Sequence, residues 1–494
     1  MTLIERQQEP VLTDTLEPGT RSSVVVATLA AAGIVVSLAQ TLVVPIIGSL
    51  PQIFQTDASN TAWVITVTLL AGAVSTPVVG RLADMYGKKR MLLIAIIPFI
   101  VGSVLCALSA DIVTMIVGRG MQGLATGMIP LGISLLHDVL PKDKAGGAIA
   151  LMSSSMGIGG ALGLPIAAAV AEFADWRVLF WGTAGAAALV ALAIWRAIPV
   201  REPKGQAHGF DYVGAFGLAS GLIALMLAIS KGAEWGWGSA LTIGCFVTAA
   251  VVLGLWGWYE LRRRAPLVDL RTTTKPVILL TNIASILVGF AMYAMNLIVP
   301  QVMQLPVEIG YGLGQSMFQM GLWAAPMGIG MMAVSNLGAR ISRVRGAKVT
   351  LTLAGIVIAV GYGVTAVVLA TIGSRAPGPA DDAVVLWTLI LLTVGTTVVG
   401  CGVGFAFGAM PALIMSAAPA NEKAAANGFN SLMRSLGTTA SAAIVGAVLG
   451  SMVHRVGEYI FPTQGAFILS LVIGCIAALV ASVIASTIPG NVKR

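Results

Sequence analysis

Few side chains in this 494-residue sequence could do chemistry, and the most unusual of them is an arginine inside an apolar run. Arg119 lies seven residues into the run at 112–136, and Gln122 follows one helical turn later on the same face. A guanidinium in such a segment is costly unless it faces water or a partner. Gln40 and Thr41 stand at a similar depth in another run. We therefore predict that these four residues line a polar cavity for a small-molecule substrate. We also expect Arg119→Ala to stop activity without unfolding the chain.

The composition excludes a soluble enzyme. Only 10% of the residues are charged and 57% are hydrophobic, whereas soluble domains carry about 25% charged residues. The four cysteines lie singly and the three histidines lie far apart, so neither a disulfide framework nor a metal site is expected. The sequence has no HExxH, GxSxG or Walker motif. We expect the protein to lie in a lipid bilayer and to bind no cofactor, ATP or nucleic acid. We also expect no enzymatic activity.

Fourteen apolar runs approach or exceed the length of about 20 residues that a membrane-spanning helix needs. They lie at 24–47, 62–80, 91–109, 112–136, 146–171, 178–198, 213–230, 239–258, 277–300, 315–336, 349–372, 384–410, 428–450 and 466–488. With a cytoplasmic N-terminus, nearly all of the 29 Lys and Arg residues, including those of a loop at 423–434, fall on the inner side. The exceptions are Arg119, Arg177, Lys231, Arg375 and Arg455. By the positive-inside rule we expect an all-α integral membrane protein with both termini cytoplasmic.

The sequence repeats parts of itself in the same order. The paired segments are 42–51 with 297–306, 123–130 with 404–411, and 151–154 with 432–435. These pairs relate spans 1–6 to spans 9–14 and leave spans 7–8 as an insert. We predict tails at 1–22 and 489–494, six-helix bundles at 23–200 and 276–488, and a linker with spans 7–8 at 201–275. Two such bundles can rock against each other about a central site, as secondary transporters do.

The loop between the second and third spans carries a motif. It reads Gly80-Arg81-Leu82-Ala83-Asp84-Met85-Tyr86-Gly87-Lys88-Lys89-Arg90 and resembles the signature of the major facilitator superfamily at this place. Fourteen spans with a central extra pair resemble its drug:proton antiporter family. The resemblance implies a cytoplasmic latch formed by Gly80, Arg81, Asp84, Gly87, Lys88, Lys89 and Arg90. Asp84 can face the positive N-terminus of a neighbouring helix, Gly80 permits close approach and Gly87 a tight turn. The basic residues would pair with Asp84 or with lipid headgroups.

Two further segments are similar to motifs of the same superfamily. Arg119-Gly-Met-Gln122-Gly123 resembles a motif of its fourth span. Span 5 resembles the antiporter motif imperfectly, because Leu164 separates Gly163 from Pro165 and alanines replace the closing glycines. We predict that Gly159, Gly163 and Pro165 form a close-packing hinge.

One departure from the fourteen-span family affects the expected mechanism. Ala39 and Val44 stand where its first span usually has Asp and Asn, and no Asp or Glu lies in the middle of any predicted span. Proton coupling therefore rests on the resemblance alone, with Asp111 and Asp84 as weak candidates. A cavity with Arg119 and no carboxylate favours neutral or anionic amphipathic substrates over cations. The other polar and aromatic residues expected to line it are Tyr293, Asn296, Gln319 and Trp323.

Together these observations predict an exporter of small amphipathic compounds by multidrug-type efflux. We expect a monomer in the plasma membrane that uses the proton gradient as its energy source. Two alternatives stay open. One is a carrier for a single metabolite or lipid, working by import or without proton coupling, and the other is a membrane scaffold or receptor that transports nothing.

Overall fold

The computed structural model describes residues 15–16, 22–47, 49–198, 200–201, 209–263, 266–371, 382–456 and 459–489. Within these ranges fourteen helical segments are long and apolar enough to cross a membrane, which confirms the predicted number of spans. Most of both predicted tails lies outside the described residues, and so do residues 372–381.

The first six spans form the N-terminal half. They are α1 (Ser22–Thr41), α3 (Ala58–Tyr86), α4 (Lys88–Leu108), α5 (Ile112–Gly123) with α6 (Met128–Val139), α7 (Lys142–Phe173) and α8 (Arg177–Ala197), with the short α2 (Leu50–Ile53) after the first. The fourth span is not one continuous α-helix, because the 3₁₀ turn η1 (Leu124–Gly127) separates α5 from α6. Pro130 lies in the first turn of α6, where proline is tolerated. Because proline has no backbone N–H, Pro130 cannot donate a hydrogen bond to the carbonyl of Thr126.

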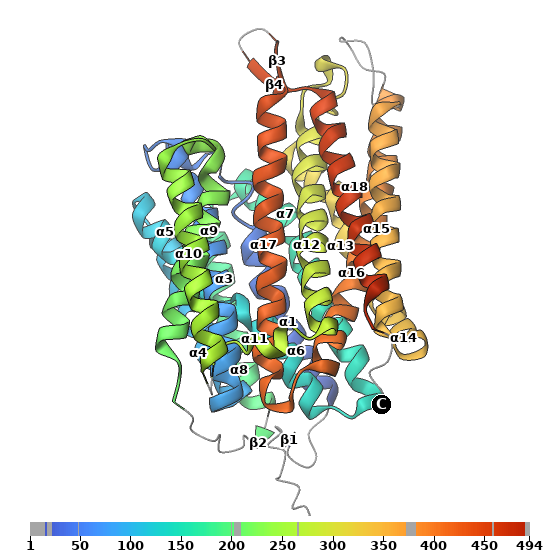
Figure 1. Cartoon of the computed structure of the whole chain (residues 1–494). Helices are drawn as coiled ribbons and strands as arrows, with labels where there is room; N and C mark the ends of the chain where they lie inside the picture. The colour runs from blue at the N-terminus through green and yellow to red at the C-terminus, as the bar shows by residue number, and fades with distance from the viewer. Residues whose placement is uncertain are drawn as a thin grey trace, which may run out of the picture.

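The next two spans, α9 (Tyr212–Trp235) and α10 (Ala240–Arg262), form a hairpin outside both halves. The hairpin lies beside α3 and α17 (Figure 1). Leu218, Leu222 and Met226 of α9 share an apolar cluster with Leu70 of α3 and Leu432 of α17. The extra pair therefore packs on the seam where the two halves meet.

The last six spans form the C-terminal half, preceded by the short α11 (Leu270–Thr273). They are α12 (Pro276–Gln304), α13 (Met317–Ala333) with α14 (Ser335–Arg345), α15 (Ala347–Ala370), α16 (Asp382–Ala417), α17 (Lys423–Ser451) and α18 (Gln464–Thr487). The remaining elements are η2 (Val307–Ile309), η3 (Ala420–Glu422) and two antiparallel strand pairs, β1 (Thr15–Leu16) with β2 (Val200–Arg201) and β3 (Val453–Val456) with β4 (Tyr459–Pro462).

Several predicted span boundaries need correction, among them those of the first and thirteenth spans. The first span was expected to continue to residue 47, but regular helix ends at Thr41 and hydrogen-bonded turns follow. Its repeat partner α12 continues as helix through Pro300 to Gln304, so the two repeats differ here. Residues 423–434, expected as part of a loop, are helical from Lys423 onward as the first turns of α17.

The apolar core follows the two halves. One cluster fills the C-terminal half, while the N-terminal half holds two, one around Leu92 and Met128 and the other around Val43 and Phe180. The predicted domain boundaries remain a prediction.

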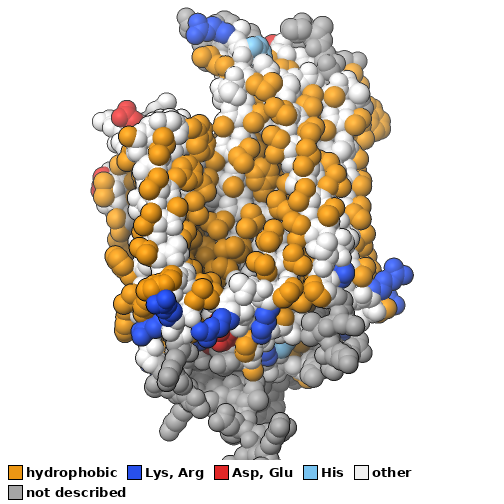
Figure 2. Space-filling view, in the orientation of Figure 1, with side chains coloured by type: hydrophobic (Ala, Val, Ile, Leu, Met, Phe, Trp, Pro, Cys, Tyr) orange, Lys and Arg blue, Asp and Glu red, His pale blue; other side chains and the backbone are white. Residues whose placement is uncertain are grey.

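The two ends of the helical bundle differ in charge. We call the end that carries Lys88, Arg262, Arg345 and Lys423 the basic end, and the end that carries β3 and β4 the opposite end. On the face shown in Figure 2, most basic side chains gather at the basic end, below a wide apolar band. The same face is hollowed between the α9–α10 pair and α17, toward the opposite end, and the walls of the hollow are apolar.

Candidate functional site

Arg119 is buried in the N-terminal half, at 1% exposure. Its Nε donates to the carbonyl of Val64 over 3.3 Å, and one terminal nitrogen donates to the carbonyl of Ala39 over 2.9 Å and to Oε1 of Gln122 over 2.7 Å. Gln122 in turn donates to the hydroxyl of Ser103 over 2.8 Å. Arg119 and Gln122 together thus connect α1, α3, α4 and α5, and these hydrogen-bond partners of the guanidinium are oxygens of its own half.

Of the other predicted cavity residues in this half, Gln40 lies beside the same gap as Arg119, whereas Thr41 does not. Gln40, Arg119 and Gln122 line a narrow gap that has no residue from the C-terminal half. Thr41 points instead toward α7, where its hydroxyl lies 3.5 Å from the carbonyl of Gly159. The cluster is therefore an internal feature of one half.

The four predicted cavity residues of the C-terminal half lie apart from the gap around Arg119. Asn296 is exposed and its amide donates to the carbonyl of Met292 in its own helix. Gln319 is also exposed and closes a capping box with Ser316 at the start of α13. The indole of Trp323 donates to Gln315 over 3.2 Å, and Tyr293 is partly buried. The polar side chains of Asn296 and Gln319 therefore form hydrogen bonds with groups of their own helix or its N-cap.

The predicted latch brings the two halves together at the basic end. The carboxylate of Asp84 accepts hydrogen bonds from the backbone N–H groups of Ala424 and Ala425, over 3.2 and 2.9 Å, in the first turn of α17. A negative charge is stabilised there by the unpaired N–H groups and the helix dipole. A Cβ at Gly80 would come within 2.7 Å of the carbonyl oxygen of Ala424, so only glycine permits this approach.

Two basic residues of the latch, Lys88 and Lys89, contact groups other than Asp84. Lys88 forms its ion pair with Asp138 at the end of α6, and Lys89 donates to the carbonyl of Trp195. Asp138 also lies 3.4 Å from Lys423 at the start of α17, which adds a second polar contact between the halves. Gly87 has φ 98°, a left-handed conformation that lets α4 begin directly after α3. None of the ion pairs found in the described ranges joins a latch lysine or arginine to Asp84.

The predicted hinge of α7 packs against both halves. A Cβ at Gly159 would come within 2.6 Å of the carbonyl of Ile34 in α1, and one at Gly163 would collide with the hydroxyl of Thr41. On another side, a Cβ at Gly321 of α13 would lie 2.9 Å from Pro165. The Gly and Pro residues of α7 therefore let it contact α1 of its own half and α13 of the other.

Arg434, the most informative residue near the seam between the halves, was not expected there from the sequence. It was assigned to a cytoplasmic loop, but it lies about 17 Å along α17 at 1.5 Å per residue, well inside the span. A signal was present: Arg434 falls six residues into the predicted run at 428–450, close to the seven residues of Arg119 in its own run. The repeat also aligns it with Ser153 of span 5. Arg119 is therefore not the lone arginine inside a span.

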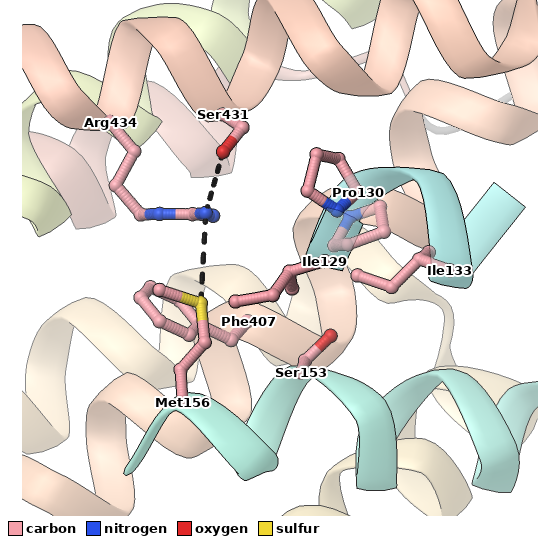
Figure 3. A pocket seen from close by; sticks show the side chains of 9 residues that line it. Ile129, Pro130, Ile133, Ser153, Met156, Phe407, Ser431 and Arg434 are labelled. Carbon is pink, nitrogen blue, oxygen red and sulfur yellow. Dashed lines mark hydrogen bonds between the residues drawn. The ribbon is translucent and has the colours of Figure 1, made fainter. Parts of the chain in front are cut away.

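Arg434 lines a narrow cavity between the two halves (Figure 3). α6 and α7 of the N-terminal half and α16 and α17 of the C-terminal half contribute to its walls. Its lining residues are Ile129, Pro130, Ile133, Ser153, Met156, Phe407, Pro411, Ser431 and Arg434. Pro130 with Pro411 and Ser153 with Arg434 are equivalent positions of the repeat, so the cavity lies where the repeats face each other.

The fold, the repeat and the latch agree with a comparison to known protein families. A model of the Major Facilitator Superfamily matches residues 29–442. The chain belongs to the major facilitator superfamily. Fourteen candidate spans are consistent with the fourteen-span branch of this superfamily.

Relatives in the superfamily include transporters from several bacteria. An uncharacterized MFS-type transporter of Mycobacterium tuberculosis (strain H37Rv) is 28% identical over 443 residues, which are 88% of this chain and 60% of that protein. Multidrug resistance protein 3 of Bacillus subtilis is 26% identical over 78% of this chain and 72% of its own length. A probable actinorhodin transporter of Streptomyces coelicolor is 28% identical over 78% and 65%. The chain thus covers less than two thirds of some curated relatives.

The solved structure of the human organic anion transporter MFSD10 (TETRAN) has the same fold. It superposes with a TM-score of 0.64 and covers 94% of this chain and 100% of that chain. The sequence identity is 14%, so the likeness concerns the fold alone.

The acidic residues of this superfamily member lie at helix ends. Among the described helices, the acidic side chains nearest to a span centre, Asp84 and Glu260, are each two residues from the end of their helix. Asp111 is exposed and caps α5, and its bonds from the N–H and hydroxyl of Thr114 hold its pKa below the usual value. A lowered pKa keeps Asp111 ionised at neutral pH, which argues against its role as a proton carrier. The described residues include no group of three or more His, Cys, Asp or Glu placed to hold a metal.

Proposed function

We propose that this chain is a secondary-active exporter of small amphipathic compounds that works by alternating access in the plasma membrane. The observation that carries the proposal is a cavity lined by both halves, next to polar contacts that join the halves on its basic side. Such an arrangement suits a site that opens to one side of a membrane at a time. The names of two bacterial relatives, which concern multidrug resistance and actinorhodin transport, support small organic compounds as cargo.

The basic end faces the cytoplasm in this proposal, by the positive-inside rule, and both termini are cytoplasmic. The latch contacts of Asp84 and Asp138 then close the cytoplasmic side, and the apolar hollow of Figure 2 lies toward the outside. Asn427 adds a seal, because its amide donates to the carbonyl of Pro130, a residue of the cavity wall, over 2.8 Å. Export would require these contacts to break and re-form in each cycle.

The proton gradient is the proposed energy source, and a monomer is the proposed unit. Coupling through Asp84 has a physical basis, because protonation of its carboxylate would weaken its bonds to the start of α17 and favour opening of the basic end. In this proposal the proton is carried by a carboxylate in the latch, and not by a carboxylate in the middle of a span.

The test uses purified full-length protein in liposomes with an imposed pH gradient. We expect transport of lipophilic dyes out of the compartment that faces the basic end, accompanied by proton movement in the opposite direction. Asp84→Asn should slow the cycle, while Asp175→Asn, which removes an exposed carboxylate at the opposite end, should not. Transport of a single compound, or in the importing direction, would support a specific carrier instead. Protein that moves none of the dyes in either direction would contradict the proposal.

A further inference from the structure

The cavity between the halves contains a positive charge without a negative partner. Arg434 donates to the hydroxyl of Ser431 over 2.9 Å and lies 3.8 Å from the sulfur of Met156. Its guanidinium carbon lies 4.6 Å from the ring centre of Phe407. None of the ion pairs found in the described part of the chain includes Arg434. These contacts hold the guanidinium in place but do not neutralise it.

The opposite wall of the cavity supplies a second polar group without a partner. Ser153 is 3% exposed, and its hydroxyl has no hydrogen-bond partner among the described residues. Figure 3 shows its oxygen on the cavity side of α7, across from the guanidinium on α17. A buried hydroxyl without a partner is costly, and so is a charge removed from water without a counter-ion. Both costs fall when a ligand accepts hydrogen bonds from both groups.

The remaining walls indicate what kind of molecule carries that acceptor. Ile129, Ile133, Met156 and Phe407 surround the two polar groups with apolar surface. An apolar pocket with a few convergent donors is typical of a small-molecule site. The donors here suit a carboxylate, sulfonate or phosphate, because a guanidinium can bond two oxygens of such a group at once. A cationic head group would instead be repelled by Arg434.

We propose that Arg434 and Ser153 form the receptor for the acidic group of an amphipathic organic anion, whose apolar body lies against Phe407 and Met156. This assignment rests on the proposed transport function and names its substrate class. It transfers the anion preference expected of Arg119 to a residue that both halves enclose. Arg119 itself is held by oxygens of the N-terminal half.

The test compares three probes with the same apolar body and different head groups: 4-phenylbutyrate, 4-phenylbutanamide and 4-phenylbutylammonium. Full-length protein is placed in phosphatidylcholine nanodiscs, and binding is measured by titration calorimetry. We expect the carboxylate to bind about tenfold or more tightly than the amide, as is usual for a charge-assisted hydrogen bond, and the ammonium to bind most weakly.

Substitutions then locate the preference. Arg434→Gln should abolish the tighter binding of the carboxylate and leave the amide within about twofold, because only the charged bond is lost. Arg434→Lys should give an intermediate loss, and Ser153→Ala a smaller one, about threefold. Arg345→Gln, which removes an exposed charge at the basic end, is the matched control. If Arg434→Gln fails to fold, the lysine and Ser153 variants still decide, since each should weaken the carboxylate alone.

Several outcomes would overturn the assignment. Wild-type protein that binds no probe, or binds all three equally, has no anion receptor in this cavity. A uniform loss for all probes in Arg434→Gln would assign Arg434 a structural role. Displacement of 4-phenylbutyrate by phosphatidylglycerol that depends on Arg434 would assign the site to an acidic lipid headgroup.

Transport of the same probes in liposomes separates this inference from the proposed function. Binding with the expected dependence on Arg434, but without transport of any probe, would refute the transporter and retain the site. Transport of the probes that does not depend on Arg434 would retain the transporter and refute the site.

Discussion

Arg119 in the N-terminal half and Arg434 in the C-terminal half both lie inside membrane-spanning segments, but they have different partners. Arg119 bonds to two backbone carbonyls and a glutamine side chain, all in its own half. Arg434 has one hydroxyl, one thioether sulfur and one aromatic ring, and it borders a cavity between the halves. The first connects helices that stay together, while the second is placed to meet a molecule that enters.

The same distinction applies to the other polar contacts. A contact within one half can be strong, because nothing in the proposed transport cycle has to break it. Contacts between the halves, such as those of Asp84 with α17, would have to break in every round of that proposed cycle, which limits them to moderate strength. We therefore expect substitutions within a half to change stability, and those between the halves to change conformation or binding.

The largest expected effect is on stability and concerns Arg119, the arginine whose partners all lie in its own half. Arg119→Ala leaves the carbonyls of Ala39 and Val64 without their donor and opens space in the N-terminal half. We expect a loss of about 3 kcal/mol in the free energy of unfolding, within the range for disrupted buried networks. Thermal unfolding in nanodiscs, followed by tryptophan fluorescence, measures it, with Arg345→Ala as the exposed control. This replaces the expectation from sequence that the chain folds normally without Arg119; a wild-type melting temperature with lost transport would restore that expectation.

The second prediction concerns the contact of Asp84 across the seam. Asp84→Asn removes a negative charge from the N-terminus of α17, an interaction worth about 1 kcal/mol and up to about 2 when partly buried. The population open at the basic end should rise by roughly tenfold. Spin labels at Tyr86→Cys and Val344→Cys, in a background without the four native cysteines, report the distance between the halves at this end.

Asp175→Asn serves as the control for the loss of a carboxylate, since Asp175 lies at the opposite end. An unchanged distance distribution in Asp84→Asn would show that the latch does not set the balance between the two states.

The third prediction contrasts Arg434 with Arg119 directly. Arg434→Met removes a partly buried charge that has no carboxylate partner among the described residues, and it keeps a long apolar side chain. We expect stability to stay the same or to rise by up to about 1 kcal/mol, as when buried charges are replaced by apolar residues. The same thermal assay measures it. A loss as large as that of Arg119→Ala would mean that both arginines hold the fold, and the comparison would fail.

The smallest expected effect is a pH dependence at the basic end. Glu422 precedes α17 and accepts a hydrogen bond from the hydroxyl of Thr272 over 3.2 Å. Burial, and then the nearby Asp269, raise the pKa of the Glu422 carboxyl above its usual value. The folded chain therefore binds this proton more tightly than the unfolded chain. Its stabilising contribution is full below the ordinary glutamate pKa and is lost as the pH rises through the raised value.

Glu422→Gln should flatten this part of the pH dependence of thermal stability between pH 4 and pH 8. The difference between wild type and variant isolates Glu422 from other titrating groups. A wild-type protein whose stability, relative to Glu422→Gln, increases with pH would contradict the sign.

Much of the fold could be predicted because its signals are local. Each of the fourteen spans is an apolar run of helical length, and the repeat in the sequence aligns Pro130 with Pro411 and Ser153 with Arg434. The geometry at Asp84, Gly80 and Gly87 also follows from the motif in which they stand. By contrast, Asn296 and Gln319 look like cavity residues in sequence but bond locally, because a polar side chain in an apolar helix can also cap or bond its own backbone.

The sequence by itself determined how many helices cross the membrane, which end carries the basic residues and which segments are related by the repeat. The first two properties are sums over residues, each of which contributes its own hydrophobicity or charge. The third is a direct likeness between two stretches of sequence. Only the tertiary structure decided that Arg119 is enclosed by one half while Arg434 and Ser153 face each other between two. The direction in which a side chain points depends on which helices pack around it, and that is a property of pairs of distant segments rather than of any one run.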